Sequence, residues 1–473
     1  MGLVLTITLV ASEALAVTTA MTIVARDLGG LELFGWVFSS FFLGSLIGIS
    51  VVGGLIDERG IAVPFVGGLI LFGIGLLICG LAQSMETIVV GRFIQGLGGG
   101  AVPPVAYVAI GRSMPDALRP RMFATLSAAW VLPGVFGPVI AGFVAETWHW
   151  RLVFLGLLPF ILVSGSIALG AMRAIPDQPG ATGAAGAERA EGADGPAAGA
   201  AGARADRRRR YAWAVAVTFG AGLLTTGLLS EDPARLIALG AAGIAITLVA
   251  FHRLTPAGTL RVARGYPAAV LLRGFLTFAF FSIDVNVALL LVEVRGWSAA
   301  AAGIALTAAT VSWTAGAWIQ ARTVARVGAE GFVRIGFPVV ALGIAGVGLA
   351  LLPAVPAWII IPTFAVAGLG MGLTYSQFAI IVLRDAPRDE QGAVTSAVSL
   401  SDALGNALGT GIAGAIVAVA LRAGAGPGPG LAAVIGMCVA VALFGFLLAP
   451  RLVHGQVATT VEPASDPARD VAA

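Results

Sequence analysis

The strongest constraint on the fold of this chain is a series of long apolar runs. A helix that crosses a membrane needs about 20 predominantly apolar residues. Fourteen runs of this kind follow one another along the 473-residue sequence, near residues 3–25, 33–56, 63–83, 88–111, 122–145, 152–172, 211–230, 234–251, 269–292, 299–321, 332–352, 356–382, 393–421 and 430–449. Charged residues make up only 11% of the chain, against about 25% in a soluble domain. The sequence therefore predicts an all-α integral membrane protein.

The spacing of the runs divides the chain into parts of six, two and six spans. We predict a first six-helix bundle over 1–173, two additional helices over 211–252 and a second six-helix bundle over 265–450. Residues 174–210 are rich in Ala, Gly, Pro and charge, which predicts a disordered linker, and 451–473 are expected to form a disordered tail. Twelve spans are the alternative, if the two middle runs do not cross.

The placement of arginine between the runs predicts the orientation in the membrane. Cytoplasmic loops carry an excess of basic residues. With the linker set aside, thirteen arginines lie on the side of the N-terminus: Arg59, Arg112, Arg119, Arg121, Arg173, Arg253, Arg261, Arg264, Arg322, Arg326, Arg384, Arg388 and Arg451. The opposite loops hold five: Arg26, Arg151, Arg235, Arg295 and Arg422. We therefore expect both termini to be cytoplasmic and the protein to lie in the plasma membrane.

One arginine, Arg92, lies inside an apolar run. Arginine at the centre of a lipid-facing helix costs about 2.5 to 3.5 kcal/mol on insertion scales, so it should face protein or water and have a partner. Gln95 and Gly96 follow it at i+3 and i+4 and share its face. A carboxylate such as Glu13, in the first run, is the expected partner. These residues match the motif R-x-x-Q-G of the major facilitator superfamily, which this chain resembles.

Two further segments resemble the cytoplasmic motif G-x-L-x-D-R-x-G-R-K of that superfamily. The first match is partial and runs from Gly53 to Gly60, with Asp57 as a latch at a helix N-terminus of the other bundle. Arg59 belongs to the same segment. Arg326 and Gly328 form a fainter copy after the tenth span, which suggests an internal repeat. An ordinary polar loop is the alternative interpretation of the first segment.

The fifth run is similar to the G-x-x-x-G-P-x-x-G-G signature of exporters in the superfamily. It carries Gly134, Gly137, Pro138 and Gly142, which would give a smooth face suited to a moving interface. A generic proline-kinked helix is the alternative. The stretch that begins at Trp148 resembles the start of span six in fourteen-span drug:proton antiporters.

Three acids in apolar runs are candidates for a proton or substrate pathway. Glu13 stands nine residues before Thr22, and the antiporter family has an aspartate nine residues before a proline at that place. Asp284 lies in the ninth span, the repeat counterpart of the first. Asp402, in the thirteenth span, shares a face with Gly405 and Gly409. For Glu13 and Asp402, hydrogen bonding or packing against a neighbouring helix is the alternative.

The resemblance implies a major facilitator fold and proton-coupled efflux of lipophilic or cationic drugs or natural products by alternating access. Glu13 and Asp284 would exchange a proton against substrate, and Arg92 would tune that proton site. The implied partners are a small-molecule substrate and the lipid bilayer, with no nucleic acid, and the protein is expected to be a monomer. No cofactor, metal site or enzymatic activity is expected, and the proton gradient would supply the energy. A lipid or metabolite exporter, an uptake symporter and a non-transporting sensor are the alternatives.

Overall fold

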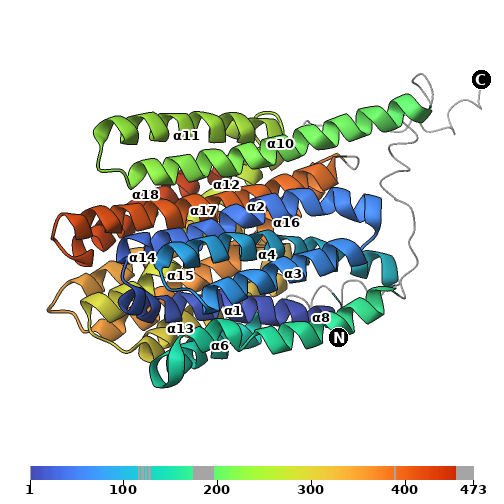
Figure 1. The fold of residues 1–473 in the computed structure, drawn as a ribbon. Helices are drawn as coiled ribbons and strands as arrows, with labels where there is room; N and C mark the ends of the chain where they lie inside the picture. Colours follow the sequence, from blue (N-terminus) through green and yellow to red (C-terminus); the bar gives the residue numbers. More distant parts are fainter. Residues whose placement is uncertain are drawn as a thin grey trace, which may run out of the picture.

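The computed structural model describes residues 2–114, 129–173, 196–387 and 390–453, with single residues 118, 122 and 125 between the first two ranges. Within these residues the regular elements are helices. Fourteen of the helical segments are long and apolar enough to cross a membrane (Figure 1). The prediction of an all-α membrane protein with fourteen spans is confirmed. Helices satisfy their own backbone hydrogen bonds, which a spanning segment requires in lipid.

The first bundle is built from the N-terminal helices. They are α1 (Gly2–Leu28), α2 (Phe34–Arg59), α3 (Ala62–Gly80), α4 (Met85–Ser113), α6 (Val131–Val144), α7 (Arg151–Leu155) and α8 (Leu158–Arg173), with the 3-10 turn η1 (Leu31–Leu33) before α2 and the π-helical turn η2 (Ala145–His149) after α6. The sixth predicted span is broken between α7 and α8. The predicted start of the fifth span, at 122, falls in a stretch that is only partly described.

The second bundle repeats this plan. Its helices are α12 (Tyr266–Leu289), α13 (Ala299–Val327), α14 (Ala329–Gly348), α15 (Ile360–Thr374), α16 (Gln377–Asp385), α17 (Gln391–Arg422) and α18 (Pro427–Leu448), with short turns η3 (Thr259–Arg261), η4 (Leu290–Val294), η5 (Leu349–Leu351), η6 (Ala357–Ile359) and η7 (Ala449–Leu452). The pairs α1–α6, α2–α4 and α3–α8 pack together, and so do their counterparts α12–α17, α13–α15 and α14–α18. The same packing order in both bundles supports the expected internal repeat.

The two bundles meet along two seams, and the molecule has two distinct ends. One seam joins α2 to α17 and the other joins α6 to α13, while α1 lies between them against α12 and α13. We call the end where α1 begins and α8 stops the linker end, and the end where α1 stops and α2 begins the far end (Figure 1).

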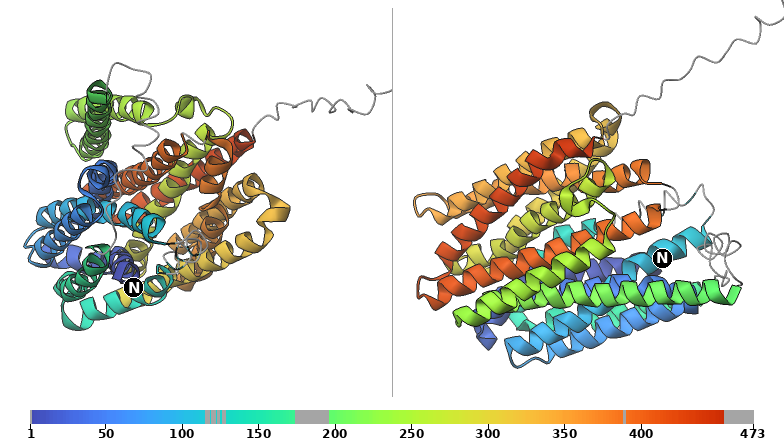
Figure 2. Two further views of the ribbon diagram at one scale, coloured as in Figure 1. Left: turned by 90° about the vertical axis from the view of Figure 1, so that its right-hand side faces the viewer. Right: turned by 90° about the horizontal axis from the view of Figure 1, so that it is seen from above.

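The two additional helices form a hairpin on the outside of the bundles. They are α10 (Pro196–Leu228) and α11 (Pro233–Leu254), and α10 projects past the other helices at the linker end (Figures 1 and 2). The predicted disordered linker of 174–210 is therefore wrong for 196–210, and 174–195 lie outside the described residues. Alanine and arginine are strong helix formers, and this segment extends a helix that the adjoining apolar run has already nucleated.

The predicted disordered tail is also wrong at its first residues. Residues 451 and 452 belong to the turn η7, and the backbone N–H of Gly265 donates a 2.9 Å hydrogen bond to the carbonyl of Arg451. The Arg451 side chain returns bonds to the carbonyls of Arg261 and Val262. These three hydrogen bonds hold the start of the tail to the loop before α12. The tail beyond 453 lies outside the described residues.

The glycines of the predicted motifs have different structural roles. A Cβ at Gly96 would overlap the carbonyl of Phe41, so this glycine is required where α4 crosses α2. Gly60 and Gly328 both have positive φ, 72° and 76°, at the ends of α2 and α13, which is a turn position that favours glycine. Gly53 makes no close contact, because a Cβ there would meet nothing within 4 Å.

The exporter-like face of α6 packs on α13, with one exception. A Cβ at Gly134 or Gly142 would overlap Thr310 or Ala300 of α13, and Gly303 of α13 lies against the backbone of Pro138. Gly137 does not belong to this contact, since a Cβ there would make only ordinary contacts with α1 at 3.8 Å. The face is therefore one half of a helix-to-helix seam between the bundles.

These contacts predict different costs for two glycine-to-valine changes. Gly96→Val should lower the free energy of unfolding by about 1 to 3 kcal/mol or more, because the Phe41 backbone cannot move without shifting α2. Gly53→Val is the matched control and should be nearly neutral. Thermal unfolding of the purified protein in detergent measures both. Equal stability of the two variants would contradict the close α2–α4 crossing.

Candidate functional site

The predicted partner of Arg92 is present. Nη1 of Arg92 donates to Glu13 Oε1 at 2.5 Å and to Gln95 Oε1 at 2.8 Å, and Nε donates to the carbonyl of Val37 at 3.3 Å. The guanidinium carbon also lies 4.4 Å from the centroid of the Phe41 ring. Helices α1, α2 and α4 thus enclose one charge pair, and Gln95 lies one turn from Arg92, as the spacing predicted.

This pair is sealed inside the first bundle. Glu13 and Gln95 are fully buried and Arg92 is 2% exposed. Two polar atoms remain without a hydrogen-bond partner, Glu13 Oε2 and Gln95 Nε2. The second carboxylate oxygen is therefore free to take a proton without breaking the bond that Oε1 accepts from Arg92. A buried carboxylate is costly when charged, so its charge here depends on Arg92.

The second bundle contains a charge pair that the sequence analysis missed. Nε of Arg273 donates to Asp402 Oδ1 at 2.7 Å, and Nη1 donates to the carbonyl of Tyr375. The side chain of Asp402 is 21% exposed. Arg273 lies inside the ninth predicted span, so the argument that singled out Arg92 would have found it. The predicted face with Gly405 and Gly409 packs on α12, and Asp402 extends from it to Arg273.

Asp284 is different from both paired acids. It lies on α12, one of the helices at the junction of the bundles, and it is partly exposed. Within the described residues no arginine, hydroxyl or amide contacts its carboxylate. A carboxylate in this position has no counter-charge of its own and can take either a proton or a cation.

A chain of aromatic rings crosses from one bundle to the other. Phe42 of α2 lies 6.4 Å from Phe281 of α12, Phe281 lies 6.2 Å from Trp313 of α13, and Trp313 lies 5.2 Å from Tyr375, measured between ring centroids. All four side chains are partly exposed. Phe281 and Asp284 are three residues apart on α12 and share a face. The rings and the free carboxylate therefore belong to one surface between the bundles.

Tyr375 joins this surface to the second charge pair. The guanidinium of Arg273 lies over the Tyr375 ring, 3.2 Å from its centroid. Met371 and Gln377, on either side of Tyr375, are fully buried, so they pack inside the second bundle.

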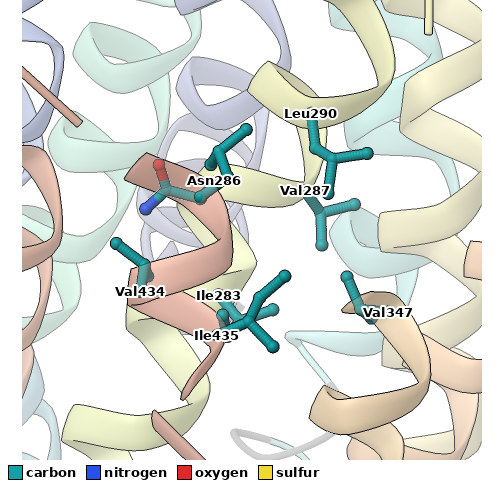
Figure 3. Close-up of a pocket in the computed structure, with 8 residues that line it drawn as sticks. Ile283, Asn286, Val287, Leu290, Val347, Val434 and Ile435 are labelled. Carbon is teal, nitrogen blue, oxygen red and sulfur yellow. The ribbon is translucent and has the colours of Figure 1, made fainter. Parts of the chain in front are cut away.

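A small pocket lies within the second bundle, and it is apolar (Figure 3). It is lined by Ile283, Asn286, Val287, Leu290, Val347, Leu431, Val434 and Ile435. Its one polar residue is Asn286, whose Nδ2 donates to the Ser282 carbonyl and whose Oδ1 has no partner. The pocket contains none of the predicted acids, and we do not assign the function to it.

At the far end, polar contacts join the two bundles. Nε of Arg26 donates to Glu293 Oε1 at 2.7 Å. The carboxylate of Glu146 accepts bonds from the backbone N–H groups of Ala299 and Ala300, at the N-terminus of α13. Trp150 donates to Asp27 at 2.7 Å within the first bundle. We call the Arg26–Glu293 pair and the Glu146 contacts the far-end clamp. The spacing of residues in the sequence did not predict this clamp.

The predicted latch at the linker end, formed by Asp57, stays a prediction. The side chain of Asp57 lies outside the described residues. In the part of the chain that the structure describes, Arg59 and Arg326 have no carboxylate partner.

The newly found pair predicts a coupled loss of stability. Arg273→Met and Asp402→Leu should each lower the free energy of unfolding by about 2 to 5 kcal/mol, because each leaves a charge without its partner. The double variant should lose clearly less than the sum. Asp284→Asn, which breaks no ion pair, is the control and should not destabilise. Thermal unfolding in detergent measures all four, and additive losses would contradict the pairing.

Comparison with known proteins agrees with this architecture. A family model described as Major Facilitator Superfamily matches residues 2–410. The chain is 36% identical over 152 residues to Multidrug resistance protein 3 of Bacillus subtilis (strain 168), which covers 32% of this chain and 30% of that protein. It is 25% identical over 422 residues to the uncharacterized MFS-type transporter Rv1877 of Mycobacterium tuberculosis (strain ATCC 25618 / H37Rv), covering 88% of this chain and 58% of the relative.

The chain thus spans less than two thirds of the length of these relatives. Among solved structures, the xylose transporter XylE from E. coli in a partially occluded inward open conformation matches with a TM-score of 0.63, 13% identity and coverage of 96% of this chain and 97% of that one. The chain belongs to the Major Facilitator Superfamily and is a multi-pass membrane protein.

Proposed function

We propose that this transporter exports lipophilic or cationic drugs or natural products in exchange for protons, by alternating access. The observation that carries the proposal is Asp284, a partly exposed carboxylate that has no partner among the described residues. It lies beside a surface of aromatic rings between the two bundles. Its surroundings suit a ligand with both a positive charge and an apolar body.

The aromatic surface supports the substrate class. A cation over the face of Trp or Tyr gains about 0.5 to 2 kcal/mol, and an apolar ligand gains further by leaving water. Trp313 and Tyr375 offer such faces, and Asp284 offers the counter-charge. The similarity to Multidrug resistance protein 3 of Bacillus subtilis agrees with this class of substrate.

Each of the three acids would have a different role in proton exchange. Asp284 would hold either a proton or the cationic substrate, since both neutralise a carboxylate that is costly to bury alone. Glu13 is already neutralised by Arg92, so a proton on its free Oε2 would leave the Arg92 charge uncompensated in the bundle. Proton binding there would favour a rearrangement of α1 against α4. Asp402 would keep Arg273 neutralised near the aromatic surface.

The two ends of the molecule support alternating access. The far-end clamp joins the bundles at one end, and Ser39 donates to the Ala407 carbonyl across the α2–α17 seam in the same half. The excess of arginine at the linker end argues that this end faces the cytoplasm. In this conformation the far end is therefore closed, and the substrate surface would be reached from the cytoplasm. Rocking of the bundles on the glycine face of α6 would open the far end and close the linker end.

Exchange of protons for substrate predicts the effect of removing each acid. In proteoliposomes with an imposed proton gradient, Glu13→Gln and Asp284→Asn should each reduce proton-coupled movement of a lipophilic cation several-fold while the protein stays folded. Substrate flux and lumenal pH are followed together. Glu32→Gln, which changes an exposed acid at the far end, is the control.

Three results would contradict parts of this proposal. Substrate movement without proton flux would exclude antiport. Unchanged transport in both acid variants would remove these residues from the mechanism. Transport of a neutral lipid or metabolite that is insensitive to Asp284→Asn would instead favour the lipid or metabolite exporter.

The far-end clamp predicts a reversible shift between conformations. Arg26→Glu should repel Glu293 and open the far end, and the swap Arg26→Glu/Glu293→Arg should close it again. The rate at which a membrane-impermeant thiol reagent modifies Ser39→Cys, buried near that end, reports the opening. Arg235 pairs with Asp232 within the hairpin, so Arg235→Glu is the control and should not change the rate. If the cysteine at position 39 reacts as fast in the swapped variant as in Arg26→Glu, this would argue against the clamp.

A further inference from the structure

The hairpin of α10 and α11 covers only one of the two seams between the bundles. Seen from the linker end, it lies over α2 and α17 on one side of the molecule (Figure 2). Helices α10 and α2 contact each other, as do α10 and α17. The hairpin therefore stands between the α2–α17 seam and the bilayer.

Contacts along the length of α10 attach it to both bundles. Tyr211 donates to the carbonyl of Val51 at 3.3 Å, and Thr218 donates to the carbonyl of Leu43 at 3.4 Å, both on α2. Thr225 packs against Gly411 of α17 so closely that a Cβ there would overlap its methyl group. Arg422, at the end of α17, donates to the Leu229 carbonyl at 2.6 Å. The cover thus runs from the linker half of the seam to the far end.

Helix α11 forms an outer layer over α10. The two helices cross closely, because a Cβ at Gly220, Gly227 or Gly243 would overlap the partner helix. The outer side of α11 exposes a row of apolar residues, Ile237, Ile244, Leu248 and Val249. Such a row suits contact with lipid chains. Helix α11 therefore faces the lipid, and α10 lies between the lipid and the α2–α17 seam.

The α6–α13 seam lacks such a cover within the described residues. Apolar side chains on both helices are exposed beside it: Phe136, Ile140, Phe143, Ile304 and Val311. The helices touch through small groups, with Thr307 donating to the Val135 carbonyl at 3.1 Å. Directly behind α6, Gly137 faces Ser12 and Leu15, which flank Glu13 on α1. The uncovered seam therefore leads from lipid to the helix that carries the sealed acid.

We propose that the hairpin closes the α2–α17 seam to the bilayer, so that a lipophilic substrate dissolved in the membrane reaches the aromatic surface only through the α6–α13 seam. This rests on the proposed function. It gives the two additional helices a role, which is to make access from lipid one-sided. The ligand class is an amphiphilic organic cation that partitions into the bilayer.

One cysteine beside the uncovered seam and one on the hairpin test the access route. Phe136→Cys borders the uncovered seam, and Leu248→Cys on the outer face of α11 is the control, since the native side chains are 54% and 48% exposed. The native Cys79 and Cys438 are buried. A bulky maleimide is attached to each variant in proteoliposomes, and transport of tetraphenylphosphonium, which dissolves in lipid, is compared with that of methyl viologen, which stays in water.

The label at Phe136→Cys should reduce tetraphenylphosphonium transport several-fold and leave methyl viologen transport unchanged, while the label at Leu248→Cys should affect neither. An equal effect of the two labels on tetraphenylphosphonium, or an equal loss of both probes at Phe136→Cys, would overturn the proposal.

A second measurement does not need transport. A benzophenone-bearing phosphonium in the same vesicles should photolabel peptides of α6 and α13 and not those of α2 and α17. Labelling of α2 or α17 would overturn the one-sided route. If the route is labelled as expected but the unmodified protein moves neither probe, the proposed function fails and the access route stands.

Discussion

The cost of an unpaired charge in an apolar environment governs this structure. Arg92 and Arg273 are both buried in membrane-spanning helices, and each is held by one carboxylate, Glu13 or Asp402. Each pair joins helices that are far apart in the sequence, and each bundle contains one. Because each buried arginine must be neutralised, it determines which helices lie together. Protonation of the partner carboxylate would therefore affect the packing of those helices.

Asp284 differs from the acids of these two pairs. The other acids in the core of the bundles are neutralised from within the protein, whereas Asp284 has no partner among the described residues and lies on a helix at the junction of the bundles. The aromatic rings from Phe42 to Tyr375 extend from the same place. The surface between the bundles thus combines one free negative charge with several π faces, which is the complement of an amphiphilic cation.

Glycine decides where the bundles approach each other, and the hairpin decides what surrounds them. The α6–α13 seam consists of Gly134, Gly142 and Gly303 against backbone and small side chains, so the helices meet with little between them. The α2–α17 seam has a similar contact of Gly35 with Gly414, but α10 lies across its outer side. Two seams of similar construction therefore differ in their access to lipid.

The sequence alone determined the spans, the repeat, the family resemblance and the partner of Arg92, because apolar length and the expense of a buried charge act locally and leave a direct signal. It also pointed to α6 as an interface. It did not give the Arg273–Asp402 pair, the far-end clamp or the aromatic chain, which depend on helices that meet only after folding. It misjudged 196–210, where helix propagation overrode a low-complexity composition. Only the tertiary structure showed which acid is left unpaired and which seam the hairpin covers, since both depend on how neighbouring helices are arranged.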